Sequence, residues 1–155
     1  MRYLAIDLGD RRTGLATGDD ESGIVSAAGV IELPLNRGDS LLDGLCQAIR
    51  DHEPEELVVG MPFNMDGSEG PRAKLVRAFV ERLTQRIDLP VRYQDERLTS
   101  VQADWEMARS GMTHKQKKQR RDALAAAAIL RDYLASLDES SDPDSFDSAS
   151  DPDSD

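Results

Sequence analysis

The sequence predicts an α/β domain built on a mixed five-stranded sheet flanked by helices. Two observations indicate this class. Three short apolar runs follow one another at the start of the chain without a helical pattern between them, and from residue 41 onward amphipathic helices alternate with further apolar runs. The first order is typical of an antiparallel meander, and the second is typical of parallel strands joined by helices.

The first three strands are expected near the start of the chain. Residues 3–8 form an apolar run that reaches Asp7 and is followed by a glycine, the pattern of a buried strand that opens into a tight turn. Residues 14–18 and 27–33 form two more runs, and the polar stretch 19–23 between them contains a glycine. A hairpin there would place the three strands side by side.

Helices and strands then alternate along the chain. A helix that ends before Pro54 presents one apolar face, made of Leu41, Leu42, Leu45 and Ile49. A second helix should begin at Pro71, because proline suits the first helical position, and its apolar residues are Leu75, Val76, Phe79, Val80 and Leu83. Strands are expected after these helices, at residues 57–60 and 90–94.

Two more helices complete the predicted order. The third has Thr99 or Ser100 as its candidate N-cap and Gly111 as its end, and its apolar residues are Val101, Trp105, Ala108 and Met112. The last helix contains Leu124, Ala127, Leu130, Leu134 and Leu137. Its four consecutive alanines, residues 125–128, would permit a close approach to the sheet.

Length and composition indicate one domain, at residues 1–137, followed by an acidic disordered tail at residues 138–155. A chain of 155 residues is long enough for one core, whereas the Ser-, Asp- and Pro-rich tail cannot bury enough apolar area to offset its entropy. The single cysteine, Cys46, is expected to be a buried thiol. We expect a cytoplasmic protein without a membrane span, since the longest uncharged apolar stretch, residues 123–130, is far too short.

The charge of the chain is divided between segments. The formal net charge is -11, but the tail holds eight acids and no Lys or Arg, so residues 1–137 carry only -3. Residues 115–121 hold five cations and no acid. The acidic average therefore does not exclude a nucleic-acid partner, because a local basic segment can contact phosphates.

Two acids are expected where strands end. Asp7 closes the first apolar strand, and Glu96 follows the strand at residues 90–94. Sites collect at the carboxyl ends of strands in open α/β sheets. If the two strands are parallel neighbours, both carboxylates face one crevice and need a cation. Two structural alternatives remain open: Asp7 could cap the following turn, and Glu96 could be an acid at a helix N-terminus.

Asp122 is the candidate third acid. It stands between the cations of residues 115–121 and the alanine-rich helix, where an aspartate is ordinarily an N-cap. On a helix packed across the sheet, however, it could join Asp7 and Glu96. Three carboxylates supply the hard oxygen ligands that Mg²⁺ or Mn²⁺ prefers.

Several residues are candidates for binding nucleic-acid phosphates. Cations near the predicted turns and an amide in a glycine-containing loop before the second helix are suited to this role: Arg11, Arg12, Asn64, Arg72 and Arg97, together with Lys115, Lys117 and Lys118 of the basic segment. A solvated connection at residues 64–72, a simple Arg97–Glu96 pair and a mobile basic loop at residues 115–121 are the alternatives.

Four motifs resemble those of the YqgF family. They are residues 5–9 (Ala-Ile-Asp-Leu-Gly) with residues 11–16, residues 58–67 with residues 70–72, residues 95–100 (Asp-Glu-Arg-Leu-Thr-Ser), and Asp122 with the alanines and apolar residues that follow it. Each motif alone is weak, because Asp-x-Gly turns also occur in sugar kinases and actin-like ATPases. Together, in this order, they cover residues 3–134.

The resemblance implies a ribonuclease H-like fold, a metal-binding triad of Asp7, Glu96 and Asp122, and metal-dependent cleavage of structured RNA in the 5′-end maturation of pre-16S ribosomal RNA. Within the same chemistry, the alternative substrate is a DNA four-way junction. The protein would act as a monomer or a homodimer.

Two hypotheses from other classes stay open at this stage. The turn after Asp7 could belong to an actin-like nucleotide-binding fold, although such proteins usually need two such domains. The chain could also be a non-catalytic RNA-binding module, which would bind its RNA equally well after Asp7→Asn.

Overall fold

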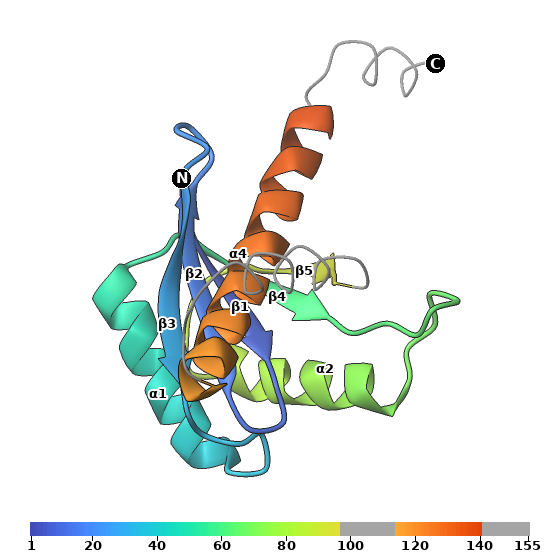
Figure 1. Cartoon of the computed structure of the whole chain (residues 1–155). Helices are drawn as coiled ribbons and strands as arrows, with labels where there is room; N and C mark the ends of the chain where they lie inside the picture. Colours follow the sequence, from blue (N-terminus) through green and yellow to red (C-terminus); the bar gives the residue numbers. More distant parts are fainter. Residues whose placement is uncertain (97–113, 141–155) are drawn as a thin grey trace.

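The computed structural model describes residues 1–96 and 114–140 of the chain (Figure 1). The described elements are β1 (Arg2–Leu8), β2 (Thr13–Asp19), β3 (Val25–Ile31), α1 (Gly38–His52), β4 (Glu56–Met61), α2 (Pro71–Thr84), β5 (Val91–Asp95) and α4 (His114–Ser140). The predicted succession of strands and helices is confirmed within these residues. The third strand begins and ends two residues earlier than the range expected from the sequence.

The five strands form one mixed sheet in the order β3-β2-β1-β4-β5. β1 pairs antiparallel with β2, and β2 pairs antiparallel with β3, as expected for a meander. β4 lies parallel to β1 and β5 lies parallel to β4. The last strand is thus parallel to the first, but the two are not neighbours, because β4 lies between them.

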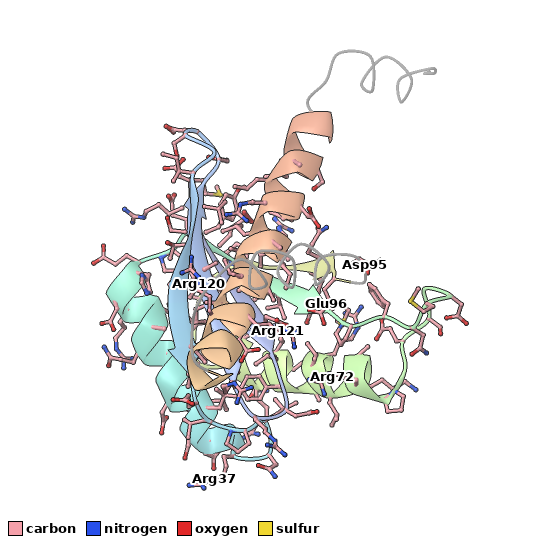
Figure 2. All side chains as sticks on the ribbon, viewed as in Figure 1. Arg37, Arg72, Asp95, Glu96, Arg120 and Arg121 are labelled. Carbon is pink, nitrogen blue, oxygen red and sulfur yellow. The ribbon has the colours of Figure 1, made fainter. Side chains whose placement is uncertain are left out.

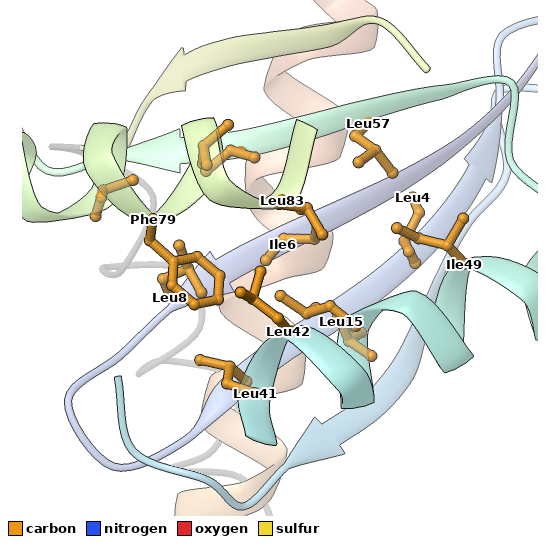
Figure 3. Packing of buried hydrophobic residues seen from close by; sticks show 14 of the residues in the cluster. Leu4, Ile6, Leu8, Leu15, Leu41, Leu42, Ile49, Leu57, Phe79 and Leu83 are labelled. Carbon is orange, nitrogen blue, oxygen red and sulfur yellow. The ribbon is translucent and has the colours of Figure 1, made fainter. Parts of the chain in front are cut away.

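The larger apolar core lies between the sheet and the helices α1 and α2, which Figure 3 shows in front of the strands, with α4 behind them. Alternate residues of β1, namely Leu4, Ile6 and Leu8, point into this core. They pack with residues of α1 and α2 that are almost fully buried: Leu41, Leu42, Leu45, Val76, Phe79 and Leu83. The strand period of two therefore assigns the intervening residues of β1 to the opposite face.

The opposite face is built from smaller residues and is covered by α4. Ala5 and Ala16 from the sheet pack against Ala126 and Ala127 of the helix, with Tyr3, Val58, Ile129 and Leu130 around them. Small side chains on both sides let the helix axis come close to the strands. The alanine run thus has the packing role expected from the sequence.

The ends of α1 and α2 follow local sequence signals. The C-cap of α1 is Glu53, which has a left-handed backbone (φ 50°) and donates its N–H to the carbonyl of Ile49, and Pro54 follows. α2 begins at Pro71 as expected. One expectation for its apolar face is wrong: Leu75 is 57% exposed, because its neighbour Val76 already points into the core. Cys46 is only partly buried beside that core.

The final helix is longer than the sequence pattern indicates. α4 begins at His114, so residues 115–121 form its first turns and are not a loop. Lys, Gln and Arg are good helix formers, which accounts for a helix without apolar periodicity there. Asp122 consequently lies inside the helix and does not cap it. At its other end α4 continues to Ser140, three residues past the expected end of the domain at Leu137.

Some expectations concern residues outside the described part. The predicted third helix with Trp105, the side chains of Arg97, Lys115, Lys117 and Lys118, and the tail from residue 141 onward belong to this group. No helix within residues 1–96 and 114–140 has both the length and the apolar character that a bilayer-spanning helix requires.

Thr13 supplies a stability prediction. Its side chain is fully buried, and its hydroxyl oxygen has no hydrogen-bond partner among residues 1–96 and 114–140. Burying such a hydroxyl costs about 1–3 kcal/mol. We expect Thr13→Val, which keeps the shape and removes the hydroxyl, to raise the free energy of unfolding by about 1 kcal/mol in urea denaturation. Thr13→Ser, which keeps the hydroxyl and loses the methyl group, should lower it; a destabilised Thr13→Val would contradict this explanation.

Candidate active site

Asp7 lies at the carboxyl end of β1, on the face of the sheet that α4 covers. The alternation that buries Tyr3 and Ala5 against α4 brings Asp7 to the same side. Its partner across the antiparallel ladder is Gly14 of β2. A carboxylate in this place is partly removed from water, and burial raises the pKa of Asp7.

Glu96 reaches Asp7 across an intervening strand. It follows β5 directly, and its backbone N–H donates to the carbonyl of Met61 at the end of β4, over a distance of 3.3 Å. Gly60 of β4 leaves the space for this approach, since a Cβ atom built there would lie 2.5 Å from Oε2 of Glu96. The side chains of Glu96 and Asp7 are hydrogen-bonded to each other. The two acids therefore meet although their strands are not neighbours.

The contact between Asp7 and Glu96 affects the pKa of both carboxyl groups. Burial, the nearby charge of Asp7 and the hydrogen bond with it raise the pKa of Glu96 to about 8. The pKa of Asp7 is raised mainly by burial and also by the charge of Asp122, whereas the hydrogen bond from Glu96 lowers it. Two carboxyl groups in contact are stable when they share a proton, or when a cation takes its place.

Asp122 comes close to this pair because α4 crosses β2 at Gly14. A Cβ atom on Gly14 would lie 1.9 Å from the backbone oxygen of Asp122, so only glycine permits this approach. The Asp122 carboxylate accepts a hydrogen bond from Nε of Arg12 at 2.6 Å. The negative charge of Asp122 thus raises the pKa of Asp7. Its own side chain is held by Arg12.

Arg72 is fixed at the same edge of the sheet. From the first turn of α2 it donates to the carboxylate of Asp10 and, at 3.2 Å, to the carbonyl oxygen of Leu8. Its charge lowers the pKa of both Asp7 and Glu96, against the larger effect of burial. Figure 2 labels Arg72 and Glu96 at this edge, with Arg120 and Arg121 on α4.

Asn64 organises the loop between β4 and α2. Its backbone N–H donates to the carbonyl of Ser68 at 2.9 Å, and its side-chain amide donates to the Ser68 hydroxyl at 3.0 Å. Gly67 has a positive φ of 88° and donates its N–H to the carbonyl of Asn64. Several polar groups of this loop are therefore used in hydrogen bonds within the loop itself.

The remaining candidate residues lie at different places. Arg11 is exposed in the turn between β1 and β2, and the neighbouring Arg12 is partly buried. Arg120 and Arg121, the two arginines of the basic segment at residues 115–121, are exposed in α4. The structure thus brings Asp7, Glu96 and Arg72 to one place, with Arg12 and Asp122 paired beside them.

Three residues that shape the site were missed at the sequence level. Gly14 and Gly60 are glycines inside strands, and such glycines often mark the close approach of another group; that signal was available. Asp10, which holds Arg72, lies in a turn and gave no signal of its own.

The acids fit a hard divalent cation in chemical type. Carboxylate oxygens are the ligands that Mg²⁺ and Mn²⁺ prefer, and the touching pair of Asp7 and Glu96 requires neutralisation. Within residues 1–96 and 114–140, no group of three His, Cys, Asp or Glu side chains converges closely enough to hold a metal ion. The pair of Asp7 and Glu96 is therefore assembled, whereas the carboxylate of Asp122 is hydrogen-bonded to Arg12.

The raised pKa of Glu96 predicts how stability depends on pH. The folded-state pKa of about 8 exceeds the ordinary value of 4.5, so the folded protein binds the extra proton more tightly than the unfolded chain does. The stability from this group is complete below pH 4.5 and is lost as the pH rises through about 8. We expect the melting temperature of the metal-free protein to fall over this range, and Mg²⁺ to raise it most at the alkaline end.

The control for this prediction is Glu96→Gln, a neutral side chain of the same size. Its melting temperature should depend less on pH than that of the wild type, because the shared proton is gone. If the melting temperatures of the two proteins depended equally on pH, Glu96 would not be the group that titrates.

Comparison with solved structures identifies the fold. The chain is similar to the Fowlpox virus resolvase, solved with a Holliday junction DNA (TM-score 0.57, 12% identity, covering 88% of this chain and 99% of that one). It is equally similar to RuvC of T. thermophilus, also solved with a Holliday junction substrate (TM-score 0.56, 16% identity, covering 88% and 96%). The mixed sheet with flanking helices is thus the ribonuclease H-like fold of the resolvases, as the family resemblance implied.

The sequence comparisons define the family. A family model described as "RuvX: Holliday junction resolvase" matches residues 1–136. The chain belongs to this family, for which YqgF is the other name, and is accordingly a nuclease, a hydrolase acting on phosphodiester bonds.

Two relatives of similar length are more than a third identical to this chain over the aligned residues. A protein of Anaeromyxobacter dehalogenans, named "Putative pre-16S rRNA nuclease", is 39% identical over 135 residues, which cover 86% of this chain and 96% of that one. A protein of Streptococcus mutans with the same name is 36% identical over 137 residues, covering 86% and 97%.

Proposed function

We propose that this protein is a divalent-metal-dependent nuclease that acts in the cytoplasm on the 5′ end of pre-16S ribosomal RNA. The observation that carries the metal-dependent part is the direct contact of Asp7 with Glu96 at the carboxyl edge of the sheet, with Asp122 close enough to influence Asp7. The choice of RNA rests on the names of the relatives from Anaeromyxobacter dehalogenans and Streptococcus mutans.

In this proposal Asp7, Glu96 and Asp122 hold Mg²⁺ or Mn²⁺. When bound, the metal supplies a more acidic attacking water and stabilises negative charge on the scissile phosphate. The three carboxylates come from β1, the residue after β5, and α4, and α4 packs directly on both of these strands. Rigid elements of this kind keep ligands in place better than loops do.

The cations around the acids would bind and orient the nucleic-acid backbone. Arg72 is held by Asp10 and Leu8, so its charge is already positioned near Asp7 and Glu96. Arg11 is exposed in the neighbouring turn, and Arg120 and Arg121 are exposed in α4. With the basic residues of the first turns of α4, they would make binding sensitive to salt and only weakly dependent on sequence.

A DNA four-way junction is the second candidate substrate. The family description names a Holliday junction resolvase, and both structural neighbours were solved with such a junction. The carboxylates and arginines of this site would serve either polymer, since the phosphodiester is the reacting group in both. A junction has two scissile strands, so a homodimer would suit this substrate and a monomer would suffice for RNA.

The test compares the two substrates under the same conditions. Purified protein is incubated with end-labelled RNA spanning the 5′ end of 16S rRNA and its leader, and separately with a labelled DNA four-way junction, in Mg²⁺, Mn²⁺ or EDTA. We expect cleavage of the RNA with either metal and none in EDTA. Preferential cutting of the junction would favour the second candidate, and folded protein that binds RNA without cutting it under any metal would contradict the nuclease proposal.

A further inference from the structure

Arg12 forms an ion pair with Asp122, the third acid. Its Nε atom lies 2.6 Å from Oδ2 of Asp122, and the two side chains are only 24% and 25% exposed. A half-buried ion pair of this kind is screened less than a surface pair. Among the described residues no three acids converge closely enough to hold a metal ion, and Asp122 is bound to Arg12 in this arrangement.

The backbone beneath Arg12 is fixed. The turn between β1 and β2 closes with a hydrogen bond from the N–H of Gly9 to the carbonyl of Arg12, at 2.9 Å. A Cβ atom on Gly9 would lie 2.5 Å from that carbonyl oxygen, so the turn is as tight as glycine allows. Any change of partner at Arg12 is therefore a movement of its side chain.

The guanidinium group of Arg12 has donors left over for a second hydrogen-bond partner. Within residues 1–96 and 114–140 its hydrogen bond to Asp122 uses Nε alone, and no other bond of its terminal nitrogens is found there. Arginine binds phosphate oxygens in pairs through its planar fork. Arg72 differs in this respect, because Asp10 and Leu8 already hold its two terminal nitrogens.

We propose that Arg12 is a positioning residue that keeps Asp122 out of the metal site until a nucleic-acid phosphate draws the guanidinium away. Asp122 is then released to join Asp7 and Glu96. This inference rests on the proposed function, since it assumes that the three acids hold the metal. The inference adds that the metal and the nucleic acid each strengthen the binding of the other through this one ion pair. The two affinities must change by the same factor, because such coupling is reciprocal.

The first measurement is the affinity of the nucleic-acid-free protein for Mn²⁺. The concentration of unbound Mn²⁺ during the titration is read from its electron paramagnetic resonance signal. Arg12→Gln removes the ion pair and frees Asp122. Arg11→Gln is the matched control, because it removes the same charge from the adjacent residue, which is exposed. We expect Arg12→Gln to bind Mn²⁺ about two- to fivefold more tightly than Arg11→Gln, the range that one ion pair allows.

The second measurement is the coupling itself. The affinity for a short fluorescent 2′-O-methyl RNA oligonucleotide, chosen to resist cleavage, is measured by anisotropy with Mn²⁺ and with EDTA. We expect Mn²⁺ to strengthen oligonucleotide binding by the same factor in the wild type and in Arg11→Gln, although loss of the Arg11 charge lowers the affinity of that variant both with Mn²⁺ and with EDTA. In Arg12→Gln the strengthening should disappear, a result that a merely structural role of Arg12 would not produce.

Three outcomes are informative. If Arg12→Gln matches Arg11→Gln in both measurements, or binds Mn²⁺ more weakly, the inference is overturned while the metal site stands. If Asp7→Asn also leaves Mn²⁺ binding unchanged, the proposed site itself is wrong and the inference falls with it. If Arg12→Gln does not fold, Arg12→Lys replaces it: lysine keeps the charge without the fork, and intact coupling in that variant would overturn the inference.

Discussion

Asp7→Asn is expected to reduce the rate of RNA cleavage by more than about a hundredfold, because loss of even an outer partner of a metal ligand can cost 10- to 100-fold. The asparagine keeps the shape of the aspartate and removes one of the two negative charges that meet at the edge of the sheet. Glu96→Gln should have a similar effect for the same reason. Both are measured as single-turnover cleavage at saturating Mg²⁺.

Loss of folding does not explain such an effect, because the metal-free site is destabilised by two acids in contact. We expect the melting temperature of Asp7→Asn without metal to equal or exceed that of the wild type at alkaline pH. Asp43→Asn is a surface control: Asp43 is 75% exposed on α1 and pairs with Arg86. Cleavage by Asp7→Asn within a few-fold of the Asp43→Asn rate would exclude Asp7 as a metal ligand.

Gly14→Ala is expected to be the most destabilising single change near the site. The added Cβ would lie 1.9 Å from the carbonyl oxygen and 2.5 Å from the carbonyl carbon of Asp122, both backbone atoms of α4. Neither can yield without displacing the helix that carries the third acid. We expect a loss of about 3 kcal/mol, hence a fall in melting temperature of about 6 °C or more, together with reduced cleavage.

Gly44→Ala is the matched control for that substitution. Gly44 lies inside α1, where an added Cβ would meet Ile31 at 3.4 Å, an ordinary contact. Alanine is the better helix former by about 1 kcal/mol, so this variant should be as stable as the wild type or more so. An unchanged melting temperature in Gly14→Ala would mean that α4 does not cross β2 as closely as described.

The order of strands and helices was predictable because each element repeats its apolar residues with the period of its own backbone. The same alternation along β1, which points Leu4 and Ile6 into one core, singled out Asp7 as a charged residue at the end of a buried strand. The residues that form the cores on the two faces of the sheet can therefore be predicted from this local pattern alone.

The relation between Asp7 and Glu96 was less predictable, since local pattern does not determine which strands are neighbours. β4 lies between β1 and β5, and the acids meet only because Gly60 has no side chain. The position of Asp122 inside α4 was missed because the first turns of that helix carry no apolar residues to reveal them. The Arg12–Asp122 pair spans 110 positions of sequence and required the packing of α4 on β2.

The most direct test of the proposed site is the anomalous diffraction of a crystal grown with Mn²⁺. We expect an anomalous peak bounded by the carboxylates of Asp7 and Glu96 at the carboxyl edge of the sheet, with no such peak in crystals of Asp7→Asn. Ordered, unprotonated side chains of both acids without a peak between them, or a peak held by other residues, would contradict it.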